Sequence, residues 1–420
     1  MHLCLFEDSD VTHLSPVAQT RGVYQIRTGA FTTLMRLWEV FDRPNVTLHA
    51  RQMLAPLIQS QTGLPVNELP GEEAVLFING RVTDLSPALA AELKRVQQST
   101  TEGKLFLQDN TVIAAWVPQP ISISLDRLIG QNSFEGLPTE QVEGATLINR
   151  LWHLIDGLQD NLRHDLSLMH RLHTEEAPAS LHKSITMINP ADIFIAPDAK
   201  IHAGAIISAE DGPVFIDQQA KVMEGAIVKG PLYLGKQSVI KARADVSKSA
   251  LGPVCKAGGE VTEAILQSFS NKAHEGFLGH AYMGSWCNIG AGTNASNLKN
   301  DYSETSFFNE SLRIFEPTGR QFLGTIMADY SKIGISSMLN TATLMGVGCN
   351  LFGSGFMPRH LPSFSWGGPE AGFQPYRLDK AFESIQRVMA RRDRIFSQEA
   401  MQQLELIFNN AHHNKSALAV

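Results

Sequence analysis

The feature that most constrains the fold is a six-residue spacing of aliphatic side chains in the C-terminal half. A three-residue insertion at 211–213 and two longer segments interrupt the spacing, which then resumes. A period of six fits neither an α-helix nor a simple alternating strand, but it is a signature of stacked β-helical coils. Three hexads would close one triangular coil of ~18 residues, with the aliphatic side chain inside. The spaced positions are Ile195, Ile201, Ile207, Ile216, Val222, Val228, Leu234, Ile240, Val246, Phe277, Met283, Ile289, Ala295, Met327, Ile333, Leu339, Met345 and Leu351.

The segments 254–270 and 301–324 break this rhythm and predict loops that leave the stack. Such loops usually serve ligands or partners rather than the core. Beyond Gly355 the rhythm stops, and two helical patterns follow to the C-terminus. Their basic cluster, from Arg387 to Arg394, is interpreted as a solvated helix face, with phosphate binding as the alternative. An ordinary β-sandwich does not fit, because it requires two-residue alternation.

The first ~120 residues alternate short apolar runs with helical patterns, which predicts an α/β layer with a mostly parallel sheet. Residues 104–117 resemble a hairpin with a polar turn at Asp109 and Asn110. Residues 146–172 have apolar side chains at helical spacing and predict a connecting helix. The sequence thus predicts an α/β domain at 1–145, a helical linker at 146–190, a β-helix at 191–357 and a helical tail at 358–420.

Composition limits the class of protein. The chain has 43% hydrophobic and 18% charged residues, as in globular proteins, and a net charge of -7 argues against nucleic acid as the main partner. No apolar run approaches the ~18 residues needed to cross a bilayer. Its four cysteines show no C-x-x-C pair and are interpreted as reduced thiols. The start, MHLCLFEDSD, turns acidic too early for a signal peptide. We therefore expect a cytoplasmic protein.

Residues 270–300 read SNKAHEGFLGHAYMGSWCNIGAGTNASNLKN. Hexad coils with this histidine, Phe-Leu-Gly and Asn-Ile-Gly-Ala-Gly-Thr pattern resemble the acyltransferase half of the bifunctional N-acetylglucosamine-1-phosphate uridylyltransferases. The whole chain is most similar to uridylyltransferase-like sugar nucleotidyltransferases, through LSPVAQTRGVYQIRTGAF, LFINGR, NLKNDY and SFSWGG as well. The resemblance implies a Rossmann-like α/β nucleotidyltransferase domain, followed by a left-handed parallel β-helix of hexapeptide repeats and C-terminal helices.

The resemblance also implies site residues in the β-helix. It places a general base on His274, because the family's histidine lies three residues before the aromatic, here Phe277. Asn288 and Asn297 match the asparagines of the family motif, and Phe277 matches its aromatic. His280 follows one hexad later. Residues six apart lie on adjacent faces of a coil, so we expect only one of the two histidines to face the acceptor groove, and the sequence leaves open which.

Charged residues beside these motifs suit a phosphorylated substrate. Lys272 and Lys299 are placed to meet anionic phosphate, and an imidazole base is suited to deprotonating an amine or hydroxyl near pH 7.

The N-terminal domain departs from the family pattern. Its first strand leads into a segment without the Gly-rich phosphate loop, so Arg21 and Arg27, with Gly29, are candidates for nucleotide phosphate binding, and surface charge is the alternative interpretation of the arginines. The family's magnesium-binding aspartate falls on Asn79-Gly80-Arg81, and an arginine cannot ligate Mg²⁺. Asn79 and Arg81 are therefore assigned to nucleotide binding. Mg²⁺ stays in doubt, since Asp84 compensates only if its loop folds back.

These observations lead to three hypotheses about function. In the first, the chain is a transferase acting on sugar phosphates or nucleotide sugars, and its β-helix moves an acyl group from acyl-CoA, by resemblance acetyl-CoA, to a sugar amine or hydroxyl. In the second, it is a sugar-1-phosphate nucleotidyltransferase acting through the N-terminal domain. In the third, it is a non-catalytic trimeric scaffold that binds nucleotide sugars. The resemblance implies a homotrimer, and we expect neither nucleic acid nor a membrane as partner.

Overall fold

A computed structural model describes residues 2–71, 73–96, 102–119, 123–125, 127–172 and 181–413. Parts of the expected linker, 173–180, and of the expected tail, 414–420, lie outside the described residues. The contacts divide the chain into two compact units. Unit 1 comprises Met1–Ile26, Phe31–Arg150 and Gln398–Gln403, and unit 2 comprises Arg27–Ala30, Leu151–Ser397 and Leu404–Val420.

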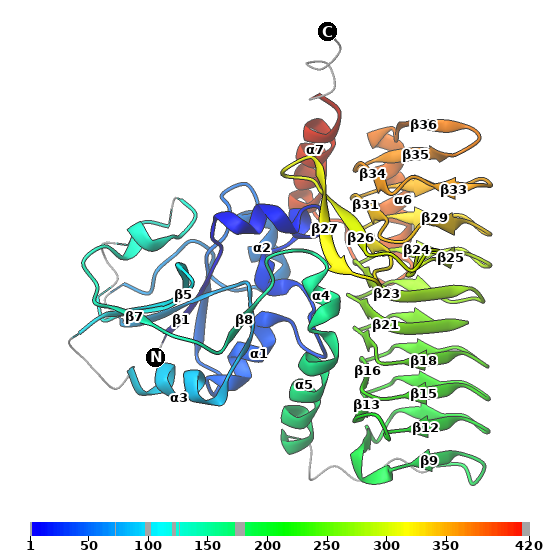
Figure 1. The fold of residues 1–420 in the computed structure, drawn as a ribbon, viewed down its shortest axis with the longest axis horizontal. Helices are drawn as coiled ribbons and strands as arrows, with labels where there is room; N and C mark the ends of the chain where they lie inside the picture. The colour runs from blue at the N-terminus through cyan, green and yellow to red at the C-terminus, as the bar shows by residue number, and fades with distance from the viewer. Residues whose placement is uncertain are drawn as a thin grey trace. The chain divides into compact units, whose positions relative to one another are not determined.

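Unit 1, coloured mainly blue to cyan in Figure 1, is built on a six-stranded sheet with the order β2-β1-β3-β6-β5-β7. The pairs β2-β1, β1-β3 and β5-β7 are parallel, whereas β3-β6 and β6-β5 are antiparallel. The expected mostly parallel sheet is therefore mixed. The reason is the β5-β6 hairpin, whose turn residues Asp109 and Asn110 both have positive φ, as two-residue hairpin turns require. The strands are β1 (His2–Phe6), β2 (Asn45–Leu48), β3 (Val75–Asn79), β5 (Lys104–Gln108), β6 (Thr111–Val117) and β7 (Thr139–Gln141).

Short helices and 3-10 turns connect these strands. The helices are α1 (Thr33–Val40), α2 (Ala55–Thr62) and α3 (Pro87–Val96). The side chain of Thr32 caps α1 by accepting a hydrogen bond from the Met35 amide. A small second sheet pairs β4 (Val82–Leu85) with β8 (Ala145–Leu147) in antiparallel orientation.

The helix expected over 146–172 is interrupted. Its first residues form strand β8, and helices α4 (His153–Asp156) and α5 (Leu158–Leu172) follow, separated at Gly157. Among the described helices, none combines the length and apolar character needed to span a bilayer.

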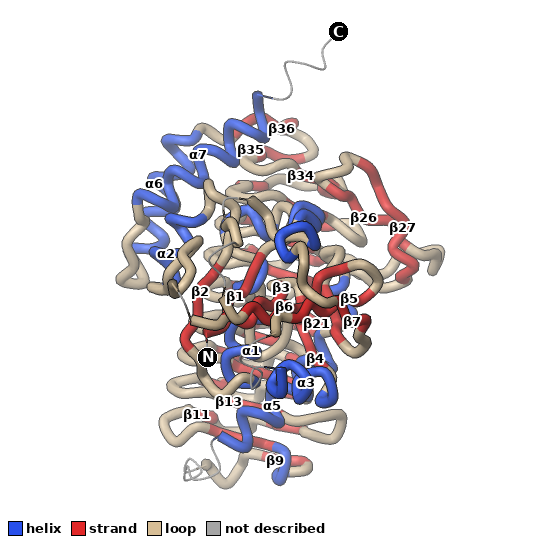
Figure 2. Tube along the Cα trace, turned by 90° about the vertical axis from the view of Figure 1, so that its left-hand side faces the viewer, coloured by secondary structure: helices blue, strands red, loops and turns tan. Residues whose placement is uncertain are grey.

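Unit 2 is a left-handed parallel β-helix of about ten turns, which confirms the predicted fold class. Its strands stack in parallel ladders from β9 and β11 at one end to β35 at the other, where β36 adds an antiparallel strand (Figures 1 and 2). We call the separate ladder that begins at β11 the first face. It contains β11 (Lys200–Ile201), β14 (Lys221–Val222), β17 (Val239–Ile240), β20 (Lys256–Ala257), β22 (Asn271–Lys272), β24 (Asn288–Ile289), β29 (Lys332–Ile333), β32 (Asn350–Leu351), β35 (Ser365–Gly368) and β36 (Gly372–Pro375).

The second and third faces belong to one sheet that bends around a corner. Two long strands, β21 (Glu260–Leu266) and β23 (Phe277–Met283), run along both faces, and their bend residues Glu263 and His280 have φ of 47°. The second face contains β9 (Thr186–Ile188), β12 (Ile206–Ser208), β15 (Ile227–Lys229), β18 (Asp245–Ser247), β25 (Asn294–Ala295), β30 (Met338–Leu339) and β33 (Phe356–Met357). The third face contains β10 (Ile193–Ile195), β13 (Val214–Ile216), β16 (Leu232–Leu234), β19 (Ala250–Leu251), β28 (Ile326–Met327), β31 (Leu344–Met345) and β34 (His360–Leu361).

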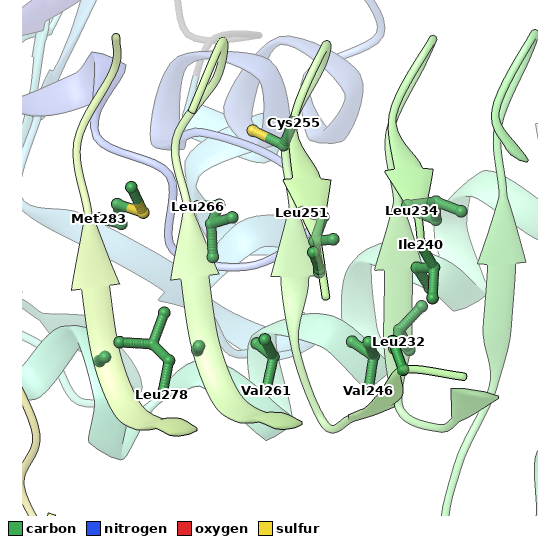
Figure 3. Close-up of a cluster of buried hydrophobic side chains, with 14 of the residues drawn as sticks. Leu232, Leu234, Ile240, Val246, Leu251, Cys255, Val261, Leu266, Leu278 and Met283 are labelled. Atoms are coloured by element: carbon green, nitrogen blue, oxygen red, sulfur yellow. The ribbon is translucent and has the colours of Figure 1, made fainter. Parts of the chain in front are cut away.

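One continuous hydrophobic core fills the β-helix, and the aliphatic positions spaced by six supply most of it. Figure 3 shows Leu234, Ile240 and Val246 among these inward-facing side chains. Two positions differ from the expected register. Leu278, not Phe277, is buried in the core, because the corner after it has one residue fewer. Lys272 occupies an interior position of the first face, in register with Ala257 and beside Ile289.

The two predicted interruptions have different structures. Residues 254–270 stay within the stack as β20 and β21, since shorter turns still close the coil. By contrast, 301–324 leaves the stack as an antiparallel hairpin of β26 (Thr305–Asn309) and β27 (Ile314–Arg320). The predicted C-terminal helices are α6 (Leu378–Ala390) and α7 (Gln398–His413).

Candidate functional site

His274 and Asn288 lie in the same groove of the β-helix. His274 is exposed in the loop 273–276, at the corner between the first and second faces, and Asn288 is the outward residue of β24. Strand alternation explains the exposure of Asn288, because the next residue, Ile289, points into the core. Both side chains line a groove of about 670 Å³ along the first face. The structure thus brings His274 together with Asn288, one of the two asparagines that the resemblance implies for substrate binding.

Four cationic side chains line this groove. Lys256 and Lys332 are outward residues of β20 and β29, while Arg391 and Arg392 directly follow α6. Among the described residues that line the groove there is no Asp or Glu. Burial and then the positive charges of Arg392, Lys241 and Arg391 lower the pKa of Lys256. The groove with His274 is therefore strongly positive.

An aromatic stack anchors the chain after α6 on the first face. The rings of Phe269 and Trp286 stack with centroids 4.3 Å apart, and the Arg394 guanidinium lies 5.6 Å from the Phe269 centroid. In addition, Arg392 donates a hydrogen bond of 3.4 Å to Asn271 Oδ1. These contacts keep residues 391–394 beside the groove.

The structure divides the basic cluster at Arg387 to Arg394. Arg387 is exposed and paired with Glu383, as expected of a solvated helix face, but Arg391 and Arg392 line the groove. The sequence carried a usable signal for Lys256 and Lys332. Each directly precedes an interior residue of the first face and must therefore point outward, into the column that contains Asn288.

Lys272, expected to meet phosphate, instead stabilises the corner of the coil. Its side chain is buried, and Nζ donates hydrogen bonds of 2.7 Å to the carbonyl oxygens of Gly258, His274 and Gly276. Burial lowers the pKa of Lys272 to about 8, although Glu275 and Glu260 oppose the shift. The ammonium holds the loop that carries His274 and does not line the groove.

His280 belongs to a separate polar cluster. Its Nδ1 lies 2.9 Å from Asn297 Nδ2, and its Nε2 lies 3.4 Å from Glu263 Oε2. Because an amide nitrogen only donates, Nδ1 accepts and the ring proton sits on Nε2, toward Glu263. The ring stacks on Phe322 with centroids 5.2 Å apart. Burial lowers the pKa of His280, and the Glu263 carboxylate opposes this. His280 and Asn297 are not among the residues that line the His274 groove.

Phe277 and Lys299 lie in a second groove of about 630 Å³, beside Asn294 and Asn340. The Lys299 ammonium donates to Ser303 Oγ at 3.3 Å and to the Glu304 carbonyl at 2.6 Å. The seven residues predicted for the β-helix therefore fall into four places: the His274 groove, this second groove, the His280 cluster and the interior position of Lys272.

In unit 1, a buried ion pair joins the residues that follow the C-terminal ends of β1 and β3. Arg81 is fully buried, and its Nε and Nη2 contact the two oxygens of Asp8 at 2.8 and 2.5 Å. Arg81 also pairs with Asp10 at 3.1 Å, and Asn79 donates to Asp8 Oδ2 at 2.7 Å. Two carboxylates held by an arginine do not fit a Mg²⁺ site. Across the part of the chain that the structure describes, no cluster of three or more His, Cys, Asp or Glu has a metal-binding arrangement.

The two other predicted nucleotide-binding arginines belong to different units. Arg21 is buried in unit 1. Arg27 belongs to unit 2, where its Nε donates to the Gln267 carbonyl at 3.3 Å and its guanidinium lies 5.6 Å from the Tyr233 ring centroid. Since both side chains are buried, neither offers an open guanidinium to a nucleotide in this conformation.

Comparison with solved structures gives low similarity scores. UDP-N-acetylglucosamine acyltransferase from Campylobacter jejuni has a TM-score of 0.25 and 13% identity, over 54% of this chain and 95% of that one. The polysialic acid O-acetyltransferase OatWY has a TM-score of 0.25 and 9% identity, over 46% of this chain and 87% of that one.

Sequence comparison finds distant relatives. Bifunctional protein GlmU of Thermodesulfovibrio yellowstonii is 23% identical over 263 residues, which are 57% of this chain and 53% of the relative. The Bartonella quintana protein of the same name is 21% identical over 308 residues, 69% of this chain and 56% of the relative. The chain thus spans about half the length of these relatives. Residues 3–174 match the family described as sugar nucleotidyl transferase, and the chain resembles the bifunctional GlmU proteins over the aligned part of its length.

Proposed function

We propose that the β-helix transfers an acyl group from acyl-CoA to an amine or hydroxyl of a sugar phosphate or nucleotide sugar at the His274 groove. The observation that carries this proposal is the meeting of an exposed imidazole, the Asn288 amide and four cations in one groove. The likeness to bifunctional GlmU proteins and the sugar nucleotidyl transferase match support a sugar-based substrate. Acetyl-CoA is the donor that the sequence resemblance favours.

In the proposed reaction, His274 acts as general base. Its ring nitrogen takes the proton from the acceptor amine or hydroxyl while the acceptor nitrogen or oxygen attacks the thioester carbonyl. A new C–N or C–O bond forms, the C–S bond breaks, and the proton passes from the imidazolium to the leaving thiolate. Asn288, at the same groove, is placed to hold a polar group of the acceptor. A positioned base of this kind contributes ~10²–10⁴-fold to a rate.

The experiment is thiol release from acetyl-CoA in the presence of amino-sugar phosphates and nucleotide sugars. His274→Ala should lower the rate by ~10²-fold or more, whereas His280→Ala should have a smaller effect, because His280 lies in another cluster. Equal rates in wild type and His274→Ala would remove the base assignment. Loss of activity in His280→Ala alone would indicate that the reaction occurs at the His280 cluster and not in the His274 groove.

A second candidate function, sugar-1-phosphate nucleotidyl transfer in unit 1, is favoured by the family match over 3–174. The buried Arg81–Asp8 pair opposes it, since the transfer needs a metal ion to neutralise developing charge. Pyrophosphate release with Mg²⁺ at ~1–10³ s⁻¹ would establish this activity. Binding of a nucleotide sugar without turnover in either assay would favour the scaffold hypothesis.

We also propose a homotrimer, with grooves formed between neighbouring β-helices around a threefold axis. Exposed apolar side chains support a contact between subunits. Met338 and Phe356 protrude from the second face, and Ile335 protrudes from the turn before β30. Light scattering on a size-exclusion peak should give three times the chain mass of 46.1 kDa. A stable monomer would reject the trimer.

A further inference from the structure

We propose that the cations of the His274 groove form a phosphate-binding subsite, built by Lys256 and Lys332 of the first face together with Arg391 and Arg392 of the chain after α6. The proposal deepens the proposed function, on which it rests for the position of the reacting group. It adds to that function the residues that recognise the anionic part of a substrate.

The first argument is the concentration of one charge sign. The four cations come from positions far apart in sequence, and the fold places them in one groove. Within the described residues, none of the four takes part in an ion pair. Several exposed cations elsewhere in unit 2 do have carboxylate partners, as in Arg387 with Glu383, Arg377 with Asp379 and Lys229 with Asp245. Like charges gathered without a carboxylate repel one another, and a bound anion would relieve that repulsion.

The second argument is the local environment of these charges. Lys332 is partly buried, and its ammonium contacts the protein through one hydrogen bond of 3.2 Å, to the Tyr330 carbonyl. Burial lowers the pKa of Lys332, so an anion that stays beside it would favour its charged form. An anion in such a partly dry setting is held more strongly than at an open surface.

The third argument is the match between donors and ligand. Two guanidinium groups offer planar pairs of N–H donors that suit phosphate oxygens, and two ammonium groups add point charges. The Phe269–Trp286 stack and the bond from Arg392 to Asn271 keep the arginines at the groove. The volume of about 670 Å³ is typical of a small-molecule site. A phosphate held by these cations would place the rest of the same molecule near His274.

The phosphate has two chemical sources, a sugar phosphate or nucleotide sugar acceptor and the nucleotide part of a CoA donor. Calorimetric titration with inorganic pyrophosphate tests the subsite itself. Titrations with UDP and with adenosine 3′,5′-bisphosphate then separate the two sources, since the true source should bind more tightly than pyrophosphate.

The test variant is Arg391→Gln/Arg392→Gln, and the matched control is Arg387→Gln, which removes a paired cation from the last turn of α6. We expect the double variant to weaken pyrophosphate binding ~10-fold or more, and the control to leave it unchanged. Lys256→Gln, on a strand, gives a second variant should the double variant fail to fold. Absence of saturable binding to wild type, or an equal loss in Arg387→Gln, would overturn the proposal.

The same titration separates this subsite from the proposed reaction. His274→Ala should keep wild-type pyrophosphate affinity, because the imidazole is not one of the four cations. Pyrophosphate binding that depends on Arg391 and Arg392, in a protein without acyl transfer, would support the subsite and reject the reaction. Acyl transfer that survives Arg391→Gln/Arg392→Gln at unchanged KM would support the reaction and reject the subsite.

Discussion

At the scale of single residues, Lys272 is the least expected feature. It stands in a column of aliphatic side chains, yet its ammonium has three carbonyl acceptors, one of them the His274 carbonyl. A buried ammonium with all its protons bonded is tolerable, whereas three corner carbonyls without a donor would be costly. We therefore regard Lys272 as a positioning residue for the loop of the candidate base.

Replacement of Lys272 by methionine should preserve the β-helix, since an unbranched apolar side chain suits the column. The loop 273–276 would lose two hydrogen bonds and Gly258 a third, and we expect acyl transfer to fall ~10–10²-fold through misplacement of His274. Lys272→Arg should not rescue activity, because a longer, planar group does not fit the same three acceptors. Wild-type activity in Lys272→Met would contradict the positioning role.

The pH dependence of stability gives an independent check on Lys272. Its pKa is lowered from 10.5 to about 8 in the folded chain, so the unfolded chain binds more protons between these pH values. The free energy of unfolding must then rise with pH between about 8 and 10.5. Below pH 8, Lys272 is protonated in both states, and its burial as an ammonium lowers the stability of the fold. Urea unfolding at pH 7 and pH 10 should show this rise in wild type and not in Lys272→Met. An equal change in both proteins would assign the effect to other groups.

At the scale of elements, the period of six was enough to predict the β-helix, because one aliphatic side chain per hexad must face a narrow core. It did not predict the corners. Leu278, and not Phe277, points into the core because the corner that follows it is one residue shorter. A six-residue spacing in the sequence does not indicate the length of each corner. Motif resemblance paired His274 with Asn288 but not with Arg391, since the docking of α6 depends on tertiary packing that local sequence does not encode.

The two groove arginines directly follow helix α6, so the packing of this helix should control ligand binding. Ala381, Ile385 and Met389 are buried along one side of the helix, at the four-residue spacing of a packed helix face. Ile385→Ala should weaken this packing by ~2–5 kcal/mol. We expect weaker pyrophosphate binding and faster proteolysis after Arg391, although no charge is removed. Ser384→Ala, on the same helix, serves as the control, and unchanged binding in Ile385→Ala would separate the subsite from the packing of α6.

At the scale of the whole molecule, the two units differ in how their strands are paired. Unit 1 mixes parallel and antiparallel pairs within one sheet, and its strand ends are occupied by the Arg81–Asp8 pair. In unit 2 the stacked strands pair in parallel with the coils before and after them, while β26–β27 and β35–β36 form antiparallel pairs. The sequence predicted the strand arrangement of unit 2 better, because the same six-residue spacing recurs in coil after coil. The strand order of unit 1 depends instead on single connections such as the β5-β6 hairpin.

The stacking of coils in the β-helix determines where the chain opens locally. A stack in which each coil rests on two neighbours frays from its ends, so a central coil opens only when many others open with it. On the first face, β22 and β24 are the fifth and sixth of ten strands. Amide hydrogen exchange should therefore be slowest at Lys272 and Ile289 and faster at Ile201 and Gly367. The chain would then keep its candidate base on the part of the stack that unfolds last, held in place by the coils on either side.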